Sequence, residues 1–464
     1  MLDELVENRY PYDHALDFFL GGHWSILQGL HISIAWAFVA VASGFVLCQF
    51  GMKFSARCAT LYFALAVFNN PAFELAGIKL NEYFGMLAMA STFVEFYFFK
   101  TPFDFRSPVV WGLMLTFSLA VTHGILMGIA YPEINPDVAT WLVRAAVNFK
   151  ILVLAVNLWI VGLAARKTRY FDFLIKSVVA CGTTGTLIYL LQILITLTGT
   201  LPYGTYIDAG FVGIPSYGSV SIERGHFGKM MAPLAPFFLF AWHRYGWGVA
   251  FALFCLTALI NISASSLSFF AIFALMAILT FRKEAFVLKK MIWASPLLIF
   301  LLLGTIEYHD VFYGVIDKIY DLAISGDEEA IGGRSSGVFL EYLSKYPLGL
   351  GYGGSTLRTG PDLPEINSGF FAFITQFSIF AIPIVIGYVM LAYLTVASGH
   401  WSGPDLLTRR CLALGVPLSA FIFFADILWF VPTIWLSFEL LWSRKSMYES
   451  RETPAIDTAH MPAS

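Results

Sequence analysis

The chain has 464 residues, of which 58% are hydrophobic, 17% aromatic and 13% charged. Soluble domains carry about 25% charged residues, so this composition excludes an ordinary soluble protein and indicates an integral membrane protein. A formal net charge of −3, with no basic stripe outside the apolar runs, argues against a nucleic-acid partner.

Long apolar runs follow one another along the chain, and a helix that crosses a bilayer needs roughly 20 residues. We therefore expect an all-α polytopic membrane protein with about twelve or thirteen transmembrane helices. The count becomes twelve if the segment YDHALDFFLGG begins a longer, tilted first helix, or if another short run lies only at the interface. The expected spans are 24–50, 59–77, 83–99, 108–130, 141–165, 171–198, 228–243, 247–262, 266–281, 291–306, 369–397, 411–426 and 428–443.

Lysine and arginine gather on alternate connections between these spans, from Lys53 and Arg57 to Arg444 and Lys445. Because basic residues favour the cytoplasmic side, we place these connections in the cytoplasm and the two longest connections on the outward side. The expected division is 1–198 (N-terminal helices), 199–227 (outward loop), 228–306 (central helices), 307–368 (large outward loop), 369–443 (C-terminal helices) and 444–464 (disordered cytoplasmic tail).

The shorter outward loop places an arginine at the mouth of a span. In GIPSYGSVSIERGHFGKMMAPLAPFF, Arg224 is followed by His226 and Lys229 and preceded by Glu223. Arginine offers a planar fork of donors and keeps its charge, which suits a pyrophosphate. The alternative for Arg224 is an anchor at the membrane interface, paired with Glu223.

The large outward loop contains RSSGVFLEYLSKYPLGLGYGGSTLRTG, residues 334–360. A serine cap and the apolar residues Phe339, Leu343 and Tyr346 predict a short amphipathic helix on the membrane surface, and Pro347 ends it. The pattern therefore predicts that a polar loop carries a helix of its own.

Residues around this helix favour an anionic ligand. Arg334 stands at its start, where free backbone N–H groups and the helix dipole attract anions. Gly349 and Gly351 would let the backbone approach a bulky ligand, and Arg358 follows them. The alternative is a flexible surface loop whose arginines are solvated or contact lipid headgroups.

A third basic group lies inside an apolar run, WLVRAAVNFKILVL. Ionisable residues are costly in a membrane and usually face a cavity, so Arg144 and Lys150 are candidate substrate-binding residues. Arg144 shares a helical face with Asn148 and lies near the outer end of its span, from which it could instead reach the interface; Lys150 lies deeper. Neither a Ser-His-Asp arrangement nor metal-ligand spacing is readable, and we expect no metal and no cofactor.

The order of these features resembles the O-antigen polymerase and ligase superfamily of bacterial polysaccharide assembly. The resemblance covers roughly residues 199–397: an arginine loop (SIERGHFGKMMAPLAPFFLF), a polar turn between spans (LINISASSLSFFAIF), and a large loop with Arg334, a helix, YPLGLGYGG and NSGFFAFITQF. Ligases of this family usually place a histidine before the span that begins NSGFF here, and often a basic residue in the turn SASSLS. Both are missing, which favours a polymerase.

The resemblance implies a GT-C-like glycosyltransferase of the bacterial inner membrane, with its active face in the periplasm. Such an enzyme joins oligosaccharide repeat units carried on undecaprenyl pyrophosphate, a polyprenyl lipid, into O-antigen-like surface polysaccharide or exopolysaccharide. By similarity, Arg224, Arg334 and Arg358 would hold the pyrophosphate. The candidates for the general base are Glu365, Asp362, His226, Asp208 and Glu223.

Two other functions stay open from the sequence. One is ligase-type transfer of the glycan to another acceptor, and the other is a transporter or flippase, which would move its substrate without chemical change. The expected partners are the lipid-linked oligosaccharide and the bilayer, with a chain-length regulator and a flippase of the same pathway as further candidates.

Overall fold

The computed structural model describes residues 26–75, 77–99, 107–131, 138–200, 202, 206–207, 216–221, 224–261, 272–277, 280, 336–351, 369–397, 405–419 and 432–452. These residues are mostly helical, which confirms the predicted helical class. Among these residues, five helical segments are long and apolar enough to cross a membrane: Leu27–Leu47, Pro108–Ala130, Arg144–Ala165, Thr168–Leu197 and Ala372–Thr395. The predicted span at 291–306 lies outside the described residues, and the spans at 266–281, 411–426 and 428–443 are described only in part.

The N-terminal half is a series of helices joined by short connections. They are α3 (Ile26–Leu47), α4 (Phe54–Ala64), α5 (Leu80–Phe99), α6 (Pro108–Ala130), α7 (Val138–Ala165) and α8 (Thr168–Leu197). Between α4 and α5 lie the 3-10 helices η1 (Leu65–Val67) and η2 (Pro71–Phe73) and a hairpin of β1 (Glu74–Leu75) and β2 (Ile78–Lys79). In the register of this hairpin, the backbone of Glu74 lies opposite that of Lys79.

The C-terminal half begins after a second small hairpin, β3 (Tyr206–Ile207) with β4 (Ser216–Tyr217). Its helical elements are α9 (Arg224–Met231), η5 (Ala232–Leu234), α10 (Ala235–Tyr245), α11 (Gly248–Ile260), α16 (Ser336–Lys345), α17 (Gly369–Phe377), η7 (Ser378–Phe380), α18 (Ala381–Ala397), α19 (Asp405–Ala413) and α21 (Pro432–Glu452).

Several boundaries differ from the predicted spans. The predicted loop helix is confirmed as α16, which ends before Pro347. The predicted span 369–397 is broken at Ser378, whose φ of +49° does not fit a right-handed helix. Helix α21 continues to Glu452, so the first part of the tail that we expected to be disordered is helical.

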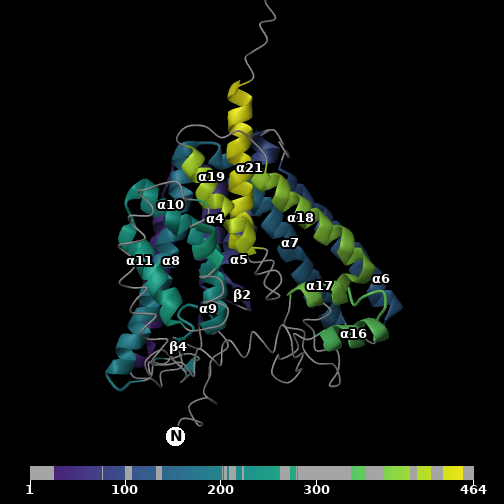
Figure 1. The fold of residues 1–464 in the computed structure, drawn as a ribbon, viewed down its shortest axis with the longest axis horizontal. Coiled ribbons are helices and arrows are strands. Elements are labelled where there is room, and N and C mark those ends of the chain that lie inside the picture. The colour runs from purple at the N-terminus through teal and green to yellow at the C-terminus, as the bar shows by residue number, and fades with distance from the viewer. Residues whose placement is uncertain are drawn as a thin grey trace, which may run out of the picture.

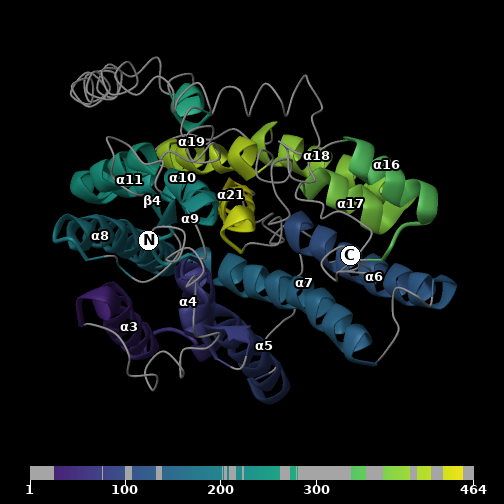
Figure 2. The same ribbon diagram turned by 90° about the horizontal axis from the view of Figure 1, so that it is seen from below.

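Helix α21 lies near the middle of the molecule, with α8, α10 and α11 on one side and α6, α17 and α18 on the other (Figures 1 and 2). It packs against α7 and α6. A buried carboxyl group, Glu439, joins these helices: Ser107 at the start of α6 donates a hydrogen bond to it, and Gly162 of α7 leaves it room. A Cβ at position 162 would clash with the Glu439 side chain, so glycine favours this packing.

The two ends of the bundle differ. Helix α16 and β4 lie at one end, opposite the C-terminal end of α21 (Figure 1). Two basic residues contact polar partners near the other end. Lys53 Nζ lies 3.8 Å from Glu95 Oε2 of α5, and Arg444 Nη1 lies 3.4 Å from Thr168 Oγ1 at the start of α8. We call the first end the loop end and the second the basic end.

Candidate functional site: a lysine cavity at the loop end

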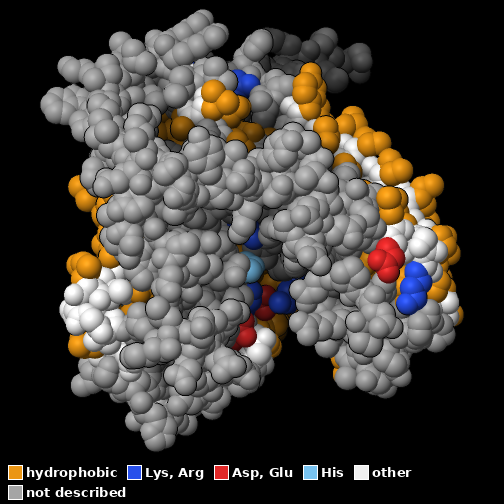
Figure 3. All heavy atoms as spheres, turned by 60° about the horizontal axis from the view of Figure 1, so that its bottom comes forward, with side chains coloured by type: hydrophobic (Ala, Val, Ile, Leu, Met, Phe, Trp, Pro, Cys, Tyr) orange, Lys and Arg blue, Asp and Glu red, His pale blue; other side chains and the backbone are white. Residues whose placement is uncertain are grey.

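A cavity of about 140 Å³ opens among α4, α5, α7 and α9, and α21 closes one wall of it with Pro432. The polar residues that line it are Asn69, Lys79, Asn81, Glu82 and Lys150. In Figure 3, basic, acidic and histidine side chains gather in a hollow on the face that includes the loop end. We refer to the cavity defined by these five polar residues as the lysine cavity.

The hairpin and the start of α5 supply most of the charge. Lys150 Nζ of α7 lies 2.9 Å from Glu82 Oε1, which is an ion pair across the two helices. Lys79, the last residue of β2, lies beside them and forms no ion pair among the described residues. Burial lowers the pKa of Lys79, and the charge of Lys150 lowers it further, while Glu82 and Glu74 raise it. The cavity therefore holds one more cation than its lining acid can balance.

Asn69 adds an unpaired amide. It follows η1, is only 2% exposed, and neither its Nδ2 nor its Oδ1 has a hydrogen-bond partner among the described residues. Its neighbour Asn70 fixes the segment, since its Nδ2 donates to Ser221 O (3.3 Å) and its Oδ1 accepts from Ala72 N (2.9 Å). A buried amide without partners is unfavourable by about 1–3 kcal/mol, and a polar ligand would remove that penalty.

The described end of the shorter predicted loop lies close to this cavity. Ser221 Oγ donates to Val67 O at 3.3 Å, and α9 follows directly. Phe227 of α9 stacks on Tyr189 with ring centroids 5.7 Å apart, and Met230 lines the cavity. The described end of the loop predicted to hold a phosphate therefore contacts residues that are next in sequence to cavity-lining Ala66 and Asn69.

Three of the predicted site residues belong to this helix. Arg224 is the first residue of α9, and its side chain lies outside the described part. His226 is half-buried, and Lys229 is buried beside the cavity-lining Met230. The structure thus brings Lys150 and helix α9, from different parts of the sequence, to one cavity.

Arg144, Gly349 and Gly351 also come together, but in a turn that packs against protein. Arg144 Nη1 donates to Leu350 O at 2.8 Å, and His123 Nε2 lies 2.9 Å from Leu348 O. Helix α6 supplies His123 and helix α7 supplies Arg144, so both helices hold the backbone of the turn. We call residues 347–351 the glycine turn.

The glycines of this turn permit a close approach to other helices. Their φ angles are +90° at Gly349 and +78° at Gly351, where a side chain is strained. A Cβ at Gly349 would lie 2.5 Å from Gln376 O, and one at Gly351 would lie 3.0 Å from Gly124 Cα. We expected these glycines to make room for a ligand; at both positions protein backbone takes that room, and their part in substrate binding stays a prediction.

The third predicted basic group is divided between two faces of α7. Asn148 Nδ2 donates to Arg144 O at 3.0 Å, so these two residues share a face. Lys150 faces the lysine cavity with Ala146, Phe149 and Val153, and it is separated from Arg144 by about 120° around the helix. The face of α7 with Arg144 thus contacts the glycine turn, while the face with Lys150 lines the lysine cavity.

The remaining predicted site residues, Arg334, Arg358 and Glu365, lie outside the described residues. Sequence analysis did not select Lys79, Glu82 or Asn69. One signal pointed to the first two: a lysine deep in a span needs an acid nearby, and the connection before the span 83–99 supplies IKLNE. Within the described residues, no three His, Cys, Asp or Glu side chains group as a metal site requires.

No family model, no curated protein and no solved structure matches this chain. The resemblance to the O-antigen polymerase and ligase superfamily therefore rests on the order of its sequence motifs.

Proposed function

We propose that the protein is a glycan polymerase of the bacterial inner membrane that joins polyprenyl-pyrophosphate-linked oligosaccharide units at the periplasmic face, and that the lysine cavity belongs to its active site. One observation carries this proposal. A lysine without an ion-pair partner among the described residues, Lys79, lies beside the Lys150–Glu82 pair and the unpaired amide of Asn69, in a cavity close to the described end of the arginine loop.

The proposed reaction needs positive charge near the leaving pyrophosphate, because negative charge develops on its oxygen. The acceptor hydroxyl forms a bond to the anomeric carbon of the donor sugar, the bond from that carbon to the pyrophosphate oxygen breaks, and the electron pair stays on the oxygen. Lys79 and Lys150 would balance the charge that develops, without a metal, in the manner of other preorganised electrostatic sites. In this proposal Arg224, Arg334 and Arg358 complete the pyrophosphate contacts, and His226 or Glu365 accepts the hydroxyl proton.

The test is glycan length in a deletion strain complemented with variants of the chain. Lys79→Met and Lys150→Met should leave single repeat units on the lipid, with polymer reduced about 100-fold or more, because each removes a charge from the leaving-group site. Lys345→Met is the matched control, since Lys345 is exposed on α16, away from the cavity. Membrane levels are checked by blot.

Stability and activity can be separated at the ion pair. Lys150→Met leaves the Glu82 carboxylate without its partner, which is expected to destabilise the fold, whereas Lys150→Met combined with Glu82→Gln removes both charges. The double variant should insert normally and still make no polymer. Full-length polymer from it would contradict the proposal. Polymer that accumulates on the lipid without transfer to its final acceptor would indicate a ligase instead, and flux of unchanged substrate into vesicles a transporter.

A further inference from the structure

A second, larger cavity of about 390 Å³ lies at the basic end, among α4, α5, α7 and α8. Three cationic side chains line it: Lys53 before α4, and Arg166 and Lys167 between α7 and α8. A fourth cation lies close, because a Cβ at the lining residue Gly51 would be 4.0 Å from Arg169 Nη1. This cavity has no part in the function proposed above.

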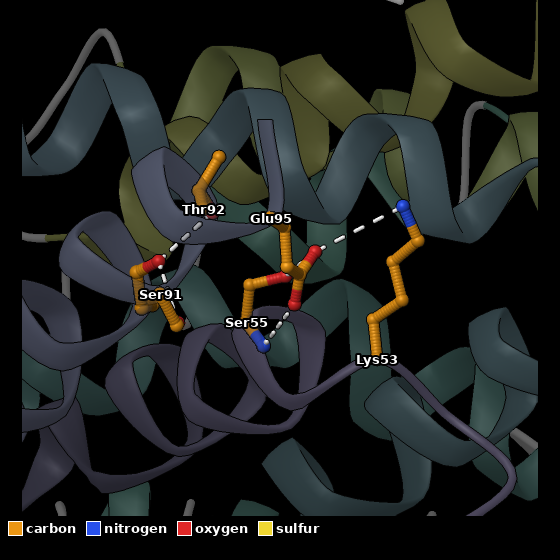
Figure 4. A network of polar contacts seen from close by, with 6 residues as sticks. Lys53, Ser55, Ser91, Thr92 and Glu95 are labelled. Carbon is orange, nitrogen blue, oxygen red and sulfur yellow. Dashed lines mark hydrogen bonds and ion pairs between the residues drawn. The ribbon is translucent and has the colours of Figure 1, made fainter. Parts of the chain in front are cut away.

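Glu95 is the lining acid, and the protein already uses both of its oxygens (Figure 4). Ser55 N donates to Oε1 at 3.2 Å and Ser55 Oγ donates to Oε2 at 3.0 Å, so the carboxylate caps the start of α4. Lys53 Nζ stands 3.8 Å from Oε2. The carboxylate is thus fixed in the wall, and the cavity keeps an excess of positive charge from Arg166 and Lys167.

Arg166 also interacts with the buried side chain of Glu439, so it is engaged within the bundle. Lys167 is exposed at the end of the bundle. Lys53, at 59% side-chain exposure, and Lys167 are therefore the cations most available to a ligand.

The opposite part of the lining is apolar and continues onto the outer surface. Trp159, Ile160 and Leu163 of α7 form one wall, and Phe96 of α5 forms another. Phe96 is 43% exposed, and the next two residues, Tyr97 and Phe98, are more exposed still. The cavity therefore opens sideways onto an aromatic surface of the kind found where helices meet lipid headgroups.

We propose that this cavity binds an anionic phospholipid, with the phosphate between Lys53 and Lys167 and an acyl chain along the wall made by Phe96. A charged head beside a lateral apolar opening fits an amphiphile. Two of the helices that form the walls, α7 and α8, are long and apolar enough to cross a membrane. A free phosphate compound would use the cations but not the apolar wall.

The experiment measures ligand binding to the full chain purified in detergent. The probes are a short-chain phosphatidylglycerol, the phosphatidylcholine with the same chains, and inorganic phosphate. The wild type should bind phosphatidylglycerol in preference to the other two. Lys53→Gln combined with Lys167→Gln should weaken phosphatidylglycerol binding about 30-fold, since each cation near an anionic lipid contributes a factor of about five.

Two further variants control this result. Lys53→Arg combined with Lys167→Arg keeps the charge and should bind like the wild type, and Lys345→Gln removes an exposed lysine of α16 and should change nothing. If the double glutamine variant does not fold, the single Lys167→Gln variant at an exposed position gives the same comparison with about a fivefold loss. The proposal would be overturned if the glutamine variants bound phosphatidylglycerol as tightly as the wild type, or if the wild type bound phosphatidylcholine as tightly as phosphatidylglycerol. Inorganic phosphate bound as tightly as phosphatidylglycerol would assign the site to a free phosphate compound. None of these outcomes depends on polymerase activity.

Discussion

Arg144 and Lys150 show how the same charge on one helix acquires different surroundings. Lys150 pairs with Glu82 and faces a cavity. Arg144 is 3% exposed, gives one hydrogen bond to Leu350 O, and has neither a partner for Nε and Nη2 nor an ion pair among the described residues. Since a buried cation without a counter-charge is unfavourable, Arg144 stabilises the position of the turn at a cost to the stability of the whole protein.

Lys79 is expected to make stability depend on pH. Burial lowers the pKa of its amine, so the unfolded chain binds a proton that the folded chain releases. The folded state therefore gains stability as the pH rises from the lowered pKa of Lys79 towards the ordinary pKa of lysine. Lys79→Met should raise the Tm at pH values below the ordinary pKa of lysine, about 10.4, and flatten the rise of the Tm towards that pH, measured by thermal unfolding in detergent. Parallel Tm curves for the two proteins would show that Lys79 does not carry this dependence.

Gly349 is expected to tolerate no side chain. Gly349→Ala puts a methyl group 2.5 Å from Gln376 O at a φ of +90°, and we expect a loss of about 1–3 kcal/mol in the free energy of unfolding. The matched control is Gly387→Ala in α18, where a Cβ meets nothing within 4 Å and helix propensity favours alanine by up to about 1 kcal/mol. Denaturant unfolding in detergent compares the two variants. Equal stabilities would show that the glycine turn is not packed as described.

At the scale of elements, the break between α17 and α18 and the glycine turn depend on each other. The last carbonyl groups of a helix have no donor within the helix. Here Leu350 N donates to Thr375 O and Gly351 N to Gln376 O, each at 2.9 Å, and Ser378 Oγ donates to Pro347 O at 2.5 Å. The turn therefore completes the C-terminal end of α17, which explains why an apolar stretch long enough for one span contains a helix end.

His123 and Arg144 should act together on this turn. Both side chains contact carbonyl groups of the turn. We therefore expect the effects of His123→Ala and Arg144→Met on the free energy of unfolding to be coupled by about 0.5–3 kcal/mol in a double-mutant cycle. Hydrogen exchange at the amides of Leu350 and Gly351 measures the opening of the turn directly. We expect about tenfold faster exchange in the single variants, and unchanged exchange would show that α6 and α7 do not hold the turn.

At the scale of the whole molecule, the two cavities lie at opposite ends of the bundle. The loop end has the lysine cavity and helix α16, whereas the basic end has Lys53, Arg166 and Lys167. This arrangement fits the alternation of basic connections along the chain. In the function proposed above, the loop end faces outward and the basic end faces the cytoplasm, as the positive-inside rule predicts.

Surface labelling tests this orientation. In a Cys48→Ser background, which removes an exposed thiol, single cysteines are introduced by Lys345→Cys and Lys167→Cys at exposed positions. A membrane-impermeant maleimide should label the first in intact spheroplasts and the second only after the membrane is opened. The reverse pattern would place the loop end in the cytoplasm and contradict the proposed orientation.

The sequence by itself determined the helical class, with apolar helices long enough to cross a membrane, and the α16 helix before Pro347, because hydropathy, helix period and caps are local properties. Tertiary structure decided which of these residues meet. It moved Lys79, Glu82 and Asn69 to the side of Lys150, and it gave Gly349 and Gly351 a packing role against α17 and α6. Contacts of this kind join residues far apart in the chain, and they depend on which faces of the helices pack together. Helical period gives the face on which a residue lies but not the helix that the face meets.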